Sequence, residues 1–323
     1  MLQLDSLSLS LPSTKTNLLA EITLHLPSSH FGAVVGPSGC GKSTLLKVIA
    51  GILSHSSGTI RWRGRDLMEK DLAPNELGYV PQFTFSQPRL TVGENIYYAA
   101  RLRRSGRAAE IQAIVEKAQE ETGLSDLRNR MAGVLSGGQL RRLGLAMELT
   151  TNPGLLLADE VTSGLDPKSE EEITALLADL ARKPGRVVLL VTHSLRFLGH
   201  YDSVTVLVDG SLAYSAHSGG LASYFNIASP EDIYPALSDR TALEWAERWI
   251  LSPLRPTLET EASPDQAKDP NLSISDRQTL LPGFWSQMFT WLSRRLKLFY
   301  RDRSQAFLQL SLLMIFPLVV SLF

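Results

Sequence analysis

A glycine-rich octapeptide near the start of the chain has the spacing GxxxxGKS: Gly36, Pro37, Ser38, Gly39, Cys40, Gly41, Lys42 and Ser43. An apolar run at 33–35 precedes it, and a helix-like stretch that opens with Thr44 follows it. In a strand–loop–helix context, the glycines let backbone N–H groups surround anionic phosphates, and Lys42 adds a positive charge. The hydroxyl of Ser43 suits Mg²⁺, which prefers oxygen ligands. These residues predict a nucleoside triphosphate site rather than a purely structural glycine turn.

Two carboxylates follow an apolar run at 155–158. In a phosphate-loop fold, an acid at the tip of such a strand lies beside the loop, so Asp159 is predicted to reach the Mg²⁺ shell. Glu160, one residue further, is placed to act as a general base on the attacking water. The alternative for an isolated Asp-Glu pair is a solvated turn, which the phosphate loop upstream disfavours.

A second glycine-rich turn precedes a helical stretch: Ser136, Gly137, Gly138 and Gln139. Exposed N–H groups, a hydroxyl and the positive end of a helix together make an anion site. Taken alone, the same residues are also typical of an ordinary loop-to-helix turn.

Size and charge limit the classes of function. The chain has 323 residues, more than one hydrophobic core usually serves, so a domain with an additional segment is expected. A net charge of -1 gives no reason to expect a nucleic-acid partner. The single cysteine, Cys40, indicates a reducing compartment, and no cleavable signal peptide is visible at the start. Its thiol is either a small loop residue or a reactive group whose pKa is lowered by Lys42.

The pattern of apolar residues predicts an α/β fold. Alternating segments at 2–11 and 18–26 predict antiparallel strands, and unbroken apolar runs at 155–158 and 187–191 predict buried parallel strands. Helices are expected at 108–122 and 139–150. The dipeptide Asp209-Gly210 predicts a hairpin between strands at 204–208 and 211–214.

The composition changes after residue 226. A short helix at 243–250 precedes a polar, proline-rich stretch at 252–275 that is typical of a linker. Next comes an aromatic and basic segment from Phe284 to Arg303 that suits a membrane interface.

The final segment is apolar. It spans 306–323, about 27 Å as a helix, which predicts a membrane span rather than a buried core helix. The basic residues before it place the preceding domain on the cytoplasmic side of the cell membrane. Because the sequence ends at Phe323, we expect a membrane domain truncated after its first helix.

Five motifs occur together in one order: the phosphate loop, Leu135–Gln139, the acidic strand end, Ser163–Asp166 and Val191–His193. Over residues 1–226 this arrangement resembles the ATP-binding cassette of ABC transporters. The resemblance implies a phosphate-loop NTPase fold with a mostly parallel central sheet and flanking helices, an antiparallel β-subdomain and an α-helical subdomain. It also implies ATP as substrate, Mg²⁺ as cofactor, and ATP hydrolysis.

The resemblance implies roles for further residues. Gln82 matches the glutamine that touches the metal and the attacking water, and His193 matches the histidine that contacts the γ-phosphate. Asp166 matches a loop at the interface between two cassettes. In that family, the turn equivalent to 136–139 covers the nucleotide of a second cassette, so a homodimer or heterodimer is implied. The implied metal ligands are Ser43, Gln82 and Asp159, and the implied catalytic residues are Lys42, Gln82, Glu160 and His193.

Within the family, Leu90–Ile96, Ala100–Arg103 and Thr162–Pro167 are most similar to the G subfamily of half-transporters. The implied domains are a cassette at 1–226, an extension and linker at 227–282, a connecting helix at 283–304 and a first transmembrane helix at 305–323. The alternative is a soluble regulatory ATPase. The segment 11–16 lacks the aromatic residue that stacks on adenine in many cassettes, and Val161 replaces a common proline. The transported substrate is not predicted.

Overall fold

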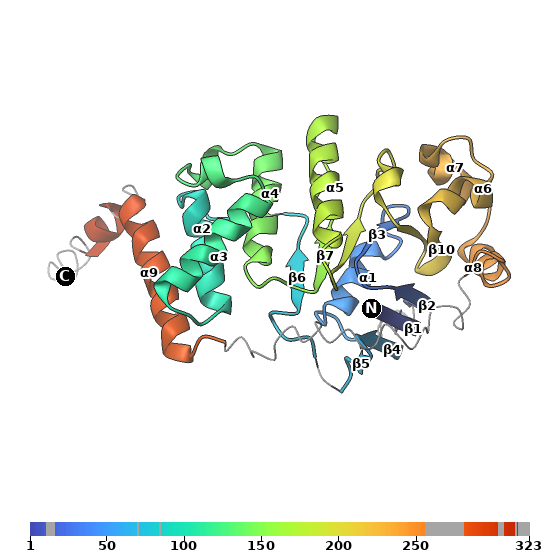
Figure 1. Cartoon of the computed structure of the whole chain (residues 1–323), viewed down its shortest axis with the longest axis horizontal. Coiled ribbons are helices and arrows are strands. Elements are labelled where there is room, and N and C mark those ends of the chain that lie inside the picture. Colours follow the sequence, from blue (N-terminus) through green and yellow to red (C-terminus); the bar gives the residue numbers. More distant parts are fainter. Residues whose placement is uncertain are drawn as a thin grey trace. The chain divides into compact units, whose positions relative to one another are not determined.

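The computed structural model describes residues 1–10, 17–69, 71–83, 85–255, 281–302, 307–313 and 315. The chain divides into two compact units. The first consists of Met1–Thr84 and Asn152–Arg277, and the second of Phe85–Thr151 and Gln278–Phe323. In Figure 1 the strands belong to the first unit, while the second unit is built from helices.

The described strands of the first unit form one sheet in the order β5-β4-β1-β2-β10-β9-β3-β8-β7-β6. They are β1 (Leu2–Ser10), β2 (Asn17–Leu26), β3 (His30–Val35), β4 (Ser57–Trp62), β5 (Arg65–Asp66), β6 (Leu77–Val80), β7 (Leu155–Asp159), β8 (Val187–Val191), β9 (Ser203–Val208) and β10 (Ser211–His217). The predicted α/β class is confirmed, and the sheet combines parallel and antiparallel pairs.

The parallel part of the sheet lies deepest in the first unit. Every residue of β7 and β8 is buried, as are all but the first residue of β3. Continuous apolar runs of this kind suit strands that are covered on both faces. The helices α1 (Lys42–Ile49) and α5 (Pro167–Ala181) pack against these strands (Figure 1). Because β3, β8, β7 and β6 are parallel, their carboxyl ends meet at one edge of the sheet.

The antiparallel parts follow the expected alternation. β1 pairs with β2 and β4, and it directs Leu2, Leu4 and Leu7 into the core. The predicted hairpin is also observed, because β9 pairs with β10 across Asp209-Gly210. Both turn residues have positive φ, 42° and 79°, as a two-residue turn between twisted strands requires.

The second unit is a helical group around its own apolar core (Figure 1). A reciprocal cap between Thr91 and Glu94 begins α2 (Val92–Arg103). The side chains of Ile96, Ile111 and Leu143 bring α2 together with two further helices. Other helical elements of this unit are α3 (Ala108–Glu121), α4 (Gly137–Leu149), α9 (Phe284–Arg301) and the 3₁₀ turns η1 (Ser125–Leu127) and η2 (Ala132–Val134).

An extension continues the first unit beyond the hairpin. Its elements are η4 (Ser218–Gly220), α6 (Leu221–Phe225), η5 (Pro230–Asp232), α7 (Ile233–Leu237) and α8 (Ala242–Ile250). A further 3₁₀ turn, η3 (Leu198–His200), precedes the hairpin. The helix predicted at 243–250 is therefore present as α8. Buried aromatic rings join it to β10, with Trp249 and Tyr214 centred 5.2 Å apart.

Two predicted segments fall mainly outside the described residues. The linker at 252–275 is described only as far as residue 255. Of the predicted membrane span at 305–323, residues 307–313 and 315 are described, and they are helical. Within the described parts of the chain, no helix combines the length and apolar character needed to cross a membrane. The span stays a prediction.

Candidate active site

The phosphate loop joins the end of β3 to α1, as the sequence predicts. Gly36 has φ 151°, and a Cβ atom there would lie 2.2 Å from the carbonyl oxygen of Leu207. Gly41 has φ 103° and precedes the first residue of α1. Glycine is required at both places because a side chain would meet backbone or strain the turn. The loop therefore presents its N–H groups and the amino end of α1 to one small region.

Lys42 is held over this loop. Its ammonium donates hydrogen bonds to the carbonyl oxygens of Gly36, at 2.9 Å, and Pro37, at 2.8 Å. The residue is only 5% exposed. A buried ammonium needs partners, and two carbonyl dipoles only partly compensate for lost water. An anionic phosphate is a stronger partner for the same charge.

Asp159 lies next to Ser43, although the two residues are 116 positions apart in the sequence. The Ser43 hydroxyl donates to Oδ1 of Asp159 at 2.7 Å, and the Tyr79 hydroxyl donates to Oδ2 at 3.1 Å. Burial and the neighbouring Asp159 carboxylate raise the pKa of Tyr79 far above its usual value, so its hydroxyl stays a donor. A hydroxyl and a carboxylate side by side are the oxygen ligands that Mg²⁺ accepts.

Glu160 is bonded at both of its carboxylate oxygens. Gln82 Nε2 donates to Oε2 at 2.9 Å, and His193 Nε2 lies 3.0 Å from Oε1. Its backbone has φ 50°, a left-handed conformation that is uncommon for a residue other than glycine. The tips of β6, β7 and β8 thus bring three of the predicted catalytic side chains into direct contact. A carboxylate held in this way can accept a proton from a water molecule.

The turn at 136–139 belongs to the second unit. Ser136 caps α4 by accepting the N–H of Gln139 at 3.3 Å, and Gln139 Oε1 accepts the N–H of Ser136 at 3.0 Å. Ser136 and Gly137 are exposed at the positive end of this helix. The turn therefore has both an ordinary capping role and a surface suited to an anion.

Asp166 also caps a helix. It accepts the N–H of Ser169 at 3.1 Å at the start of α5, and hydrogen bonds from Ser169 lower its pKa. Such a cap contributes to helix stability whatever else Asp166 does.

Cys40 is almost fully buried inside the loop. Burial raises the pKa of its thiol, and the opposing effects, including the charge of Lys42, do not reverse this. The alternative of a reactive thiol with a lowered pKa is wrong, because desolvation of the thiolate outweighs the favourable field.

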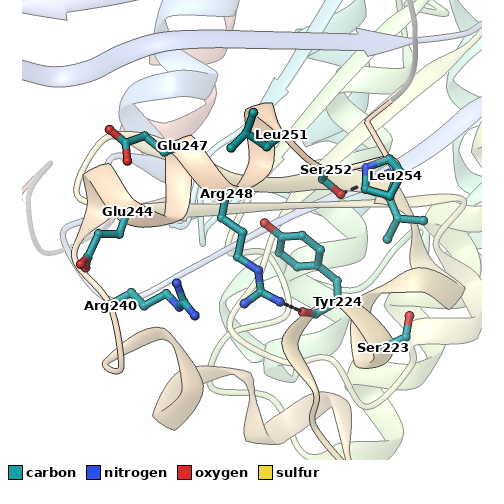
Figure 2. A pocket seen from close by; sticks show the side chains of 10 residues that line it. Ser223, Tyr224, Arg240, Glu244, Glu247, Arg248, Leu251, Ser252 and Leu254 are labelled. Carbon is teal, nitrogen blue, oxygen red and sulfur yellow. Dashed lines mark hydrogen bonds between the residues drawn. The ribbon is translucent and has the colours of Figure 1, made fainter.

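The segment 11–16, where an adenine-stacking residue is absent from the sequence, lies outside the described residues. A pocket of about 630 Å³ lies on the extension, lined by residues of α6 and α8, by Arg240 and by 251–254, and it shares no residue with the phosphate loop (Figure 2).

Sequence reasoning did not assign a role to Tyr79. The parallel pairing of β6 and β7 brings it beside the acidic strand end, with Tyr79 opposite Leu157. The signal in the sequence is only its position three residues before Gln82, and the contact with Asp159 depends on strand order.

A phosphate loop, an acidic strand end and an adjoining carboxylate held by glutamine and histidine define a phosphate-loop ATPase. Residues 19–163 match the family model described as ABC transporter. The chain carries the ATP-binding cassette of ABC transporters, and this cassette is an ABC-type ATPase.

Curated relatives cover the cassette. The chain is 35% identical over 226 residues to the ABC transporter ATP-binding/permease protein Rv1747 of Mycobacterium tuberculosis, covering 69% of this chain and 26% of that protein. It is 35% identical over 219 residues to the sulfate/thiosulfate import ATP-binding protein CysA of Mycobacterium bovis, covering 68% and 59%. It is 34% identical over 221 residues to ABC transporter G family member 23 of Arabidopsis thaliana, covering 64% and 35%. The chain thus spans less than two thirds of the length of each of these relatives.

Solved structures show the same fold. The ATP-binding cassette MJ0796, in a dimeric post-hydrolysis state bound to ADP and Pi, has a TM-score of 0.59 and 26% identity, covering 68% of this chain and 99% of that chain. The cassette MJ1267 in its ADP conformation has a TM-score of 0.62 and 22% identity, covering 74% and 99%, which supports the fold alone.

Replacing Gly36 by Ala is expected to disrupt the loop. Its Cβ would lie 2.2 Å from a backbone oxygen, so we expect ATP binding to weaken by more than about tenfold and stability to fall by about 2 kcal/mol or more. Gly39→Ala is the matched control, since Gly39 has φ 81° but no atom within 4 Å of such a Cβ. It should cost about 1 kcal/mol. Nucleotide titration and thermal melting measure both variants, and equal effects would contradict the assigned clash.

Proposed function

We propose that this chain is the ATP-hydrolysing half of an exporter-type ABC transporter, organised like the G subfamily. ATP hydrolysis by a pair of cassettes would drive movement in attached membrane helices. The observation that carries this proposal is α9, an amphipathic helix packed on the helical unit of the cassette. Sequence identity does not separate the types, because import ATP-binding proteins and a G family member match almost equally well.

In this proposal the phosphate loop with Thr44 binds the triphosphate of ATP. The ammonium of Lys42 would then donate its hydrogen bonds to phosphate oxygens instead of to the carbonyl oxygens of Gly36 and Pro37. Ser43, Asp159 and Gln82 would hold Mg²⁺, since hydroxyl, carboxylate and amide oxygens suit this cation. When bound, Mg²⁺ neutralises charge on the phosphate oxygens. Electrostatic stabilisation by residues already in position then supplies most of the catalysis.

Glu160 would orient the attacking water and accept its proton. Gln82 and His193, which already contact its two oxygens, would keep the carboxylate in place. His193 would also reach the terminal phosphate. The turn at 136–139 would complete the site of a second cassette in a dimer, and Asp166 would lie at the interface between the cassettes. The dimeric state described for the similar cassette MJ0796 supports this arrangement.

α9 is attached to α2 through Glu94. The carboxylate contacts Lys297 Nζ at 2.7 Å and Arg301 Nη2 at 2.9 Å. Tyr98, one turn further along α2, lies with its hydroxyl 3.4 Å from Ser293 Oγ. A helix held by paired charges at one end and by a polar contact along its length follows the movement of α2, which suits a connecting helix at 283–304.

The outer surface of α9 remains apolar. The exposed large apolar side chains are Phe284, Trp285, Phe289, Trp291, Leu292, Leu296 and Tyr300. Arg295 is exposed on the same helix. Aromatic rings beside basic groups are typical of helices that lie at a membrane interface. We infer that α9 lies on the cytoplasmic surface of the membrane, after the extension and linker at 227–282 and before the span at 305–323.

The charge on Glu94 should control the attachment of α9. Burial opposes ionisation of Glu94, but hydrogen bonds from Arg301 and Lys297 outweigh it and lower its pKa to about 2. Because the folded-state pKa lies below the ordinary value of 4.5, the stabilisation is fully present above about pH 4.5. It is lost as the pH falls towards 2.

Glu94→Gln removes this charge, and we expect trypsin to cleave within α9 several-fold faster at neutral pH. Glu110→Gln is the control, because Glu110 pairs with Arg107 on an exposed surface and should leave the cleavage rate unchanged. Equal cleavage of both variants would show that Glu94 does not hold α9.

Flotation with lipid vesicles, carried out with the chain shortened to residue 302 so that the span proposed at 305–323 is absent, tests the proposed function. The chain should float with phosphatidylglycerol vesicles and much less with phosphatidylcholine vesicles, because basic groups on α9 favour anionic headgroups. A variant with Trp285→Asp and Phe289→Asp should stay at the bottom of the gradient while its ATPase activity persists. A shortened chain without these substitutions that hydrolyses ATP but never floats would instead favour a soluble regulatory ATPase.

A further inference from the structure

A tyrosine from the extension reaches the histidine at the end of β8. The Tyr234 hydroxyl donates a hydrogen bond to the backbone carbonyl oxygen of His193 at 2.6 Å. The two residues are 41 positions apart, and Tyr234 lies beyond the residues that match the family model. Burial, with a smaller effect from Cys40 in the phosphate loop, raises the pKa of Tyr234 to about 12. The hydroxyl therefore stays protonated and keeps donating.

Tyr234 stands on a firmly held element. Ser229 and Asp232 cap η5 reciprocally, and the side chains of Ile233 and Leu237 are buried. The carbonyl oxygen of Leu237 also accepts the indole N–H of Trp245 at 3.1 Å, which ties α7 to α8. A hydrogen-bond donor on an anchored helix restricts the position of its acceptor more than a donor on a free loop does.

The peptide that Tyr234 holds carries the imidazole in contact with Glu160. The residues on either side of it have hydrogen bonds of their own: Ser194 N–H donates to the Thr192 hydroxyl at 3.1 Å, and Thr192 N–H donates to the carbonyl oxygen of Val34 at 3.1 Å. A second link joins the same segments, since Arg196 Nε lies 3.2 Å from Glu231 Oε1. This pair is exposed and contributes little. The Tyr234 hydrogen bond is shorter, at 2.6 Å, and its donor lies on the half-buried side chain of Tyr234.

We propose that Tyr234 is a positioning residue for ATP hydrolysis, which fixes the His193 peptide so that its imidazole stays on the Glu160 carboxylate. The proposal rests on the catalytic role assigned to His193. Because the Tyr234 hydroxyl donates to the His193 peptide rather than to the phosphate loop, its loss lowers turnover and leaves ATP affinity nearly unchanged. A net hydrogen bond of this kind corresponds to about a three- to tenfold change in rate.

Tyr234→Phe in the full chain tests this. We expect kcat to fall about three- to tenfold, with KM for ATP within about twofold of wild type. Tyr224→Phe is the matched control in the same extension. Tyr224 is 7% exposed, Arg248 stacks on its ring, and its buried hydroxyl has no hydrogen-bond partner among the described residues (Figure 2). Its kcat should equal that of wild type.

A double-mutant comparison shows whether Tyr234 acts through His193. In a His193→Ala background, Tyr234→Phe should have no further effect on kcat. An equal fold-loss in both backgrounds, or wild-type kcat in Tyr234→Phe alone, overturns the proposal. Wild-type kcat in His193→Ala would reject the role of His193 itself, and the positioning role with it. If kcat falls in His193→Ala but not in Tyr234→Phe, only the positioning role of Tyr234 is rejected.

Discussion

Replacing Glu160 by Gln should lower ATP turnover by at least about a hundredfold while ATP still binds. Glutamine keeps the shape of the side chain but cannot accept a proton from water. Its contacts with Gln82 and His193 are altered rather than removed, because an amide retains one oxygen. ATP that is bound but not hydrolysed should then accumulate in a cassette dimer. Phosphate release measures turnover, and gel filtration with ATP measures the dimer.

The control for this variant is Asp179→Asn. Asp179 forms an exposed pair with Arg182 on α5, so neutralising it should change neither turnover nor assembly. Turnover of Glu160→Gln within about twofold of wild type would reject Glu160 as the base. If turnover falls but no ATP-dependent dimer forms, the result would support Glu160 as the base and reject a site shared between two cassettes.

The second large effect is expected at Lys42. Lys42→Ala should weaken ATP binding by about a hundredfold or more, because charge-assisted hydrogen bonds to phosphate are each worth about 1.5–3 kcal/mol. Hydrolysis should fall with binding. Removing the ammonium also removes a buried charge whose hydrogen bonds go to two carbonyl oxygens and the Cys40 sulfur, with no carboxylate among them, so the fold should lose little stability.

Lys47→Ala gives the matched control, since Lys47 lies on the same helix and is exposed. Nucleotide titration should return the wild-type affinity for this variant. If Lys42→Ala binds ATP as tightly as Lys47→Ala does, the phosphate-loop assignment is wrong. Thermal melting of both variants separates a loss of binding from a loss of fold.

Local features of the structure follow closely from the sequence. The phosphate loop bends where Gly36 and Gly41 permit it, and the hairpin turns at Asp209-Gly210 because both residues tolerate positive φ. Apolar runs identify β7 and β8 as buried strands. These features depend on neighbours in the chain, whose conformational preferences are short-range.

One local argument failed at Cys40. The nearby lysine and the helix end are visible in the sequence, and both favour the thiolate. The packing that buries the sulfur is not visible there, and burial raises the pKa instead. The balance between a charge and its desolvation requires knowing what surrounds the group.

The sequence by itself determined which groups are candidates for function: the phosphate loop, the acidic strand end, the Ser136 turn and the aromatic α9. Only the tertiary structure decided which of them meet. Gln82 and His193 reach the same carboxylate across separations of 78 and 33 residues. Tyr79 and Tyr234 join this region although no motif marks them. The reason is the order of parallel strands and the packing of the extension, since contacts between distant residues depend on the whole fold rather than on local preference.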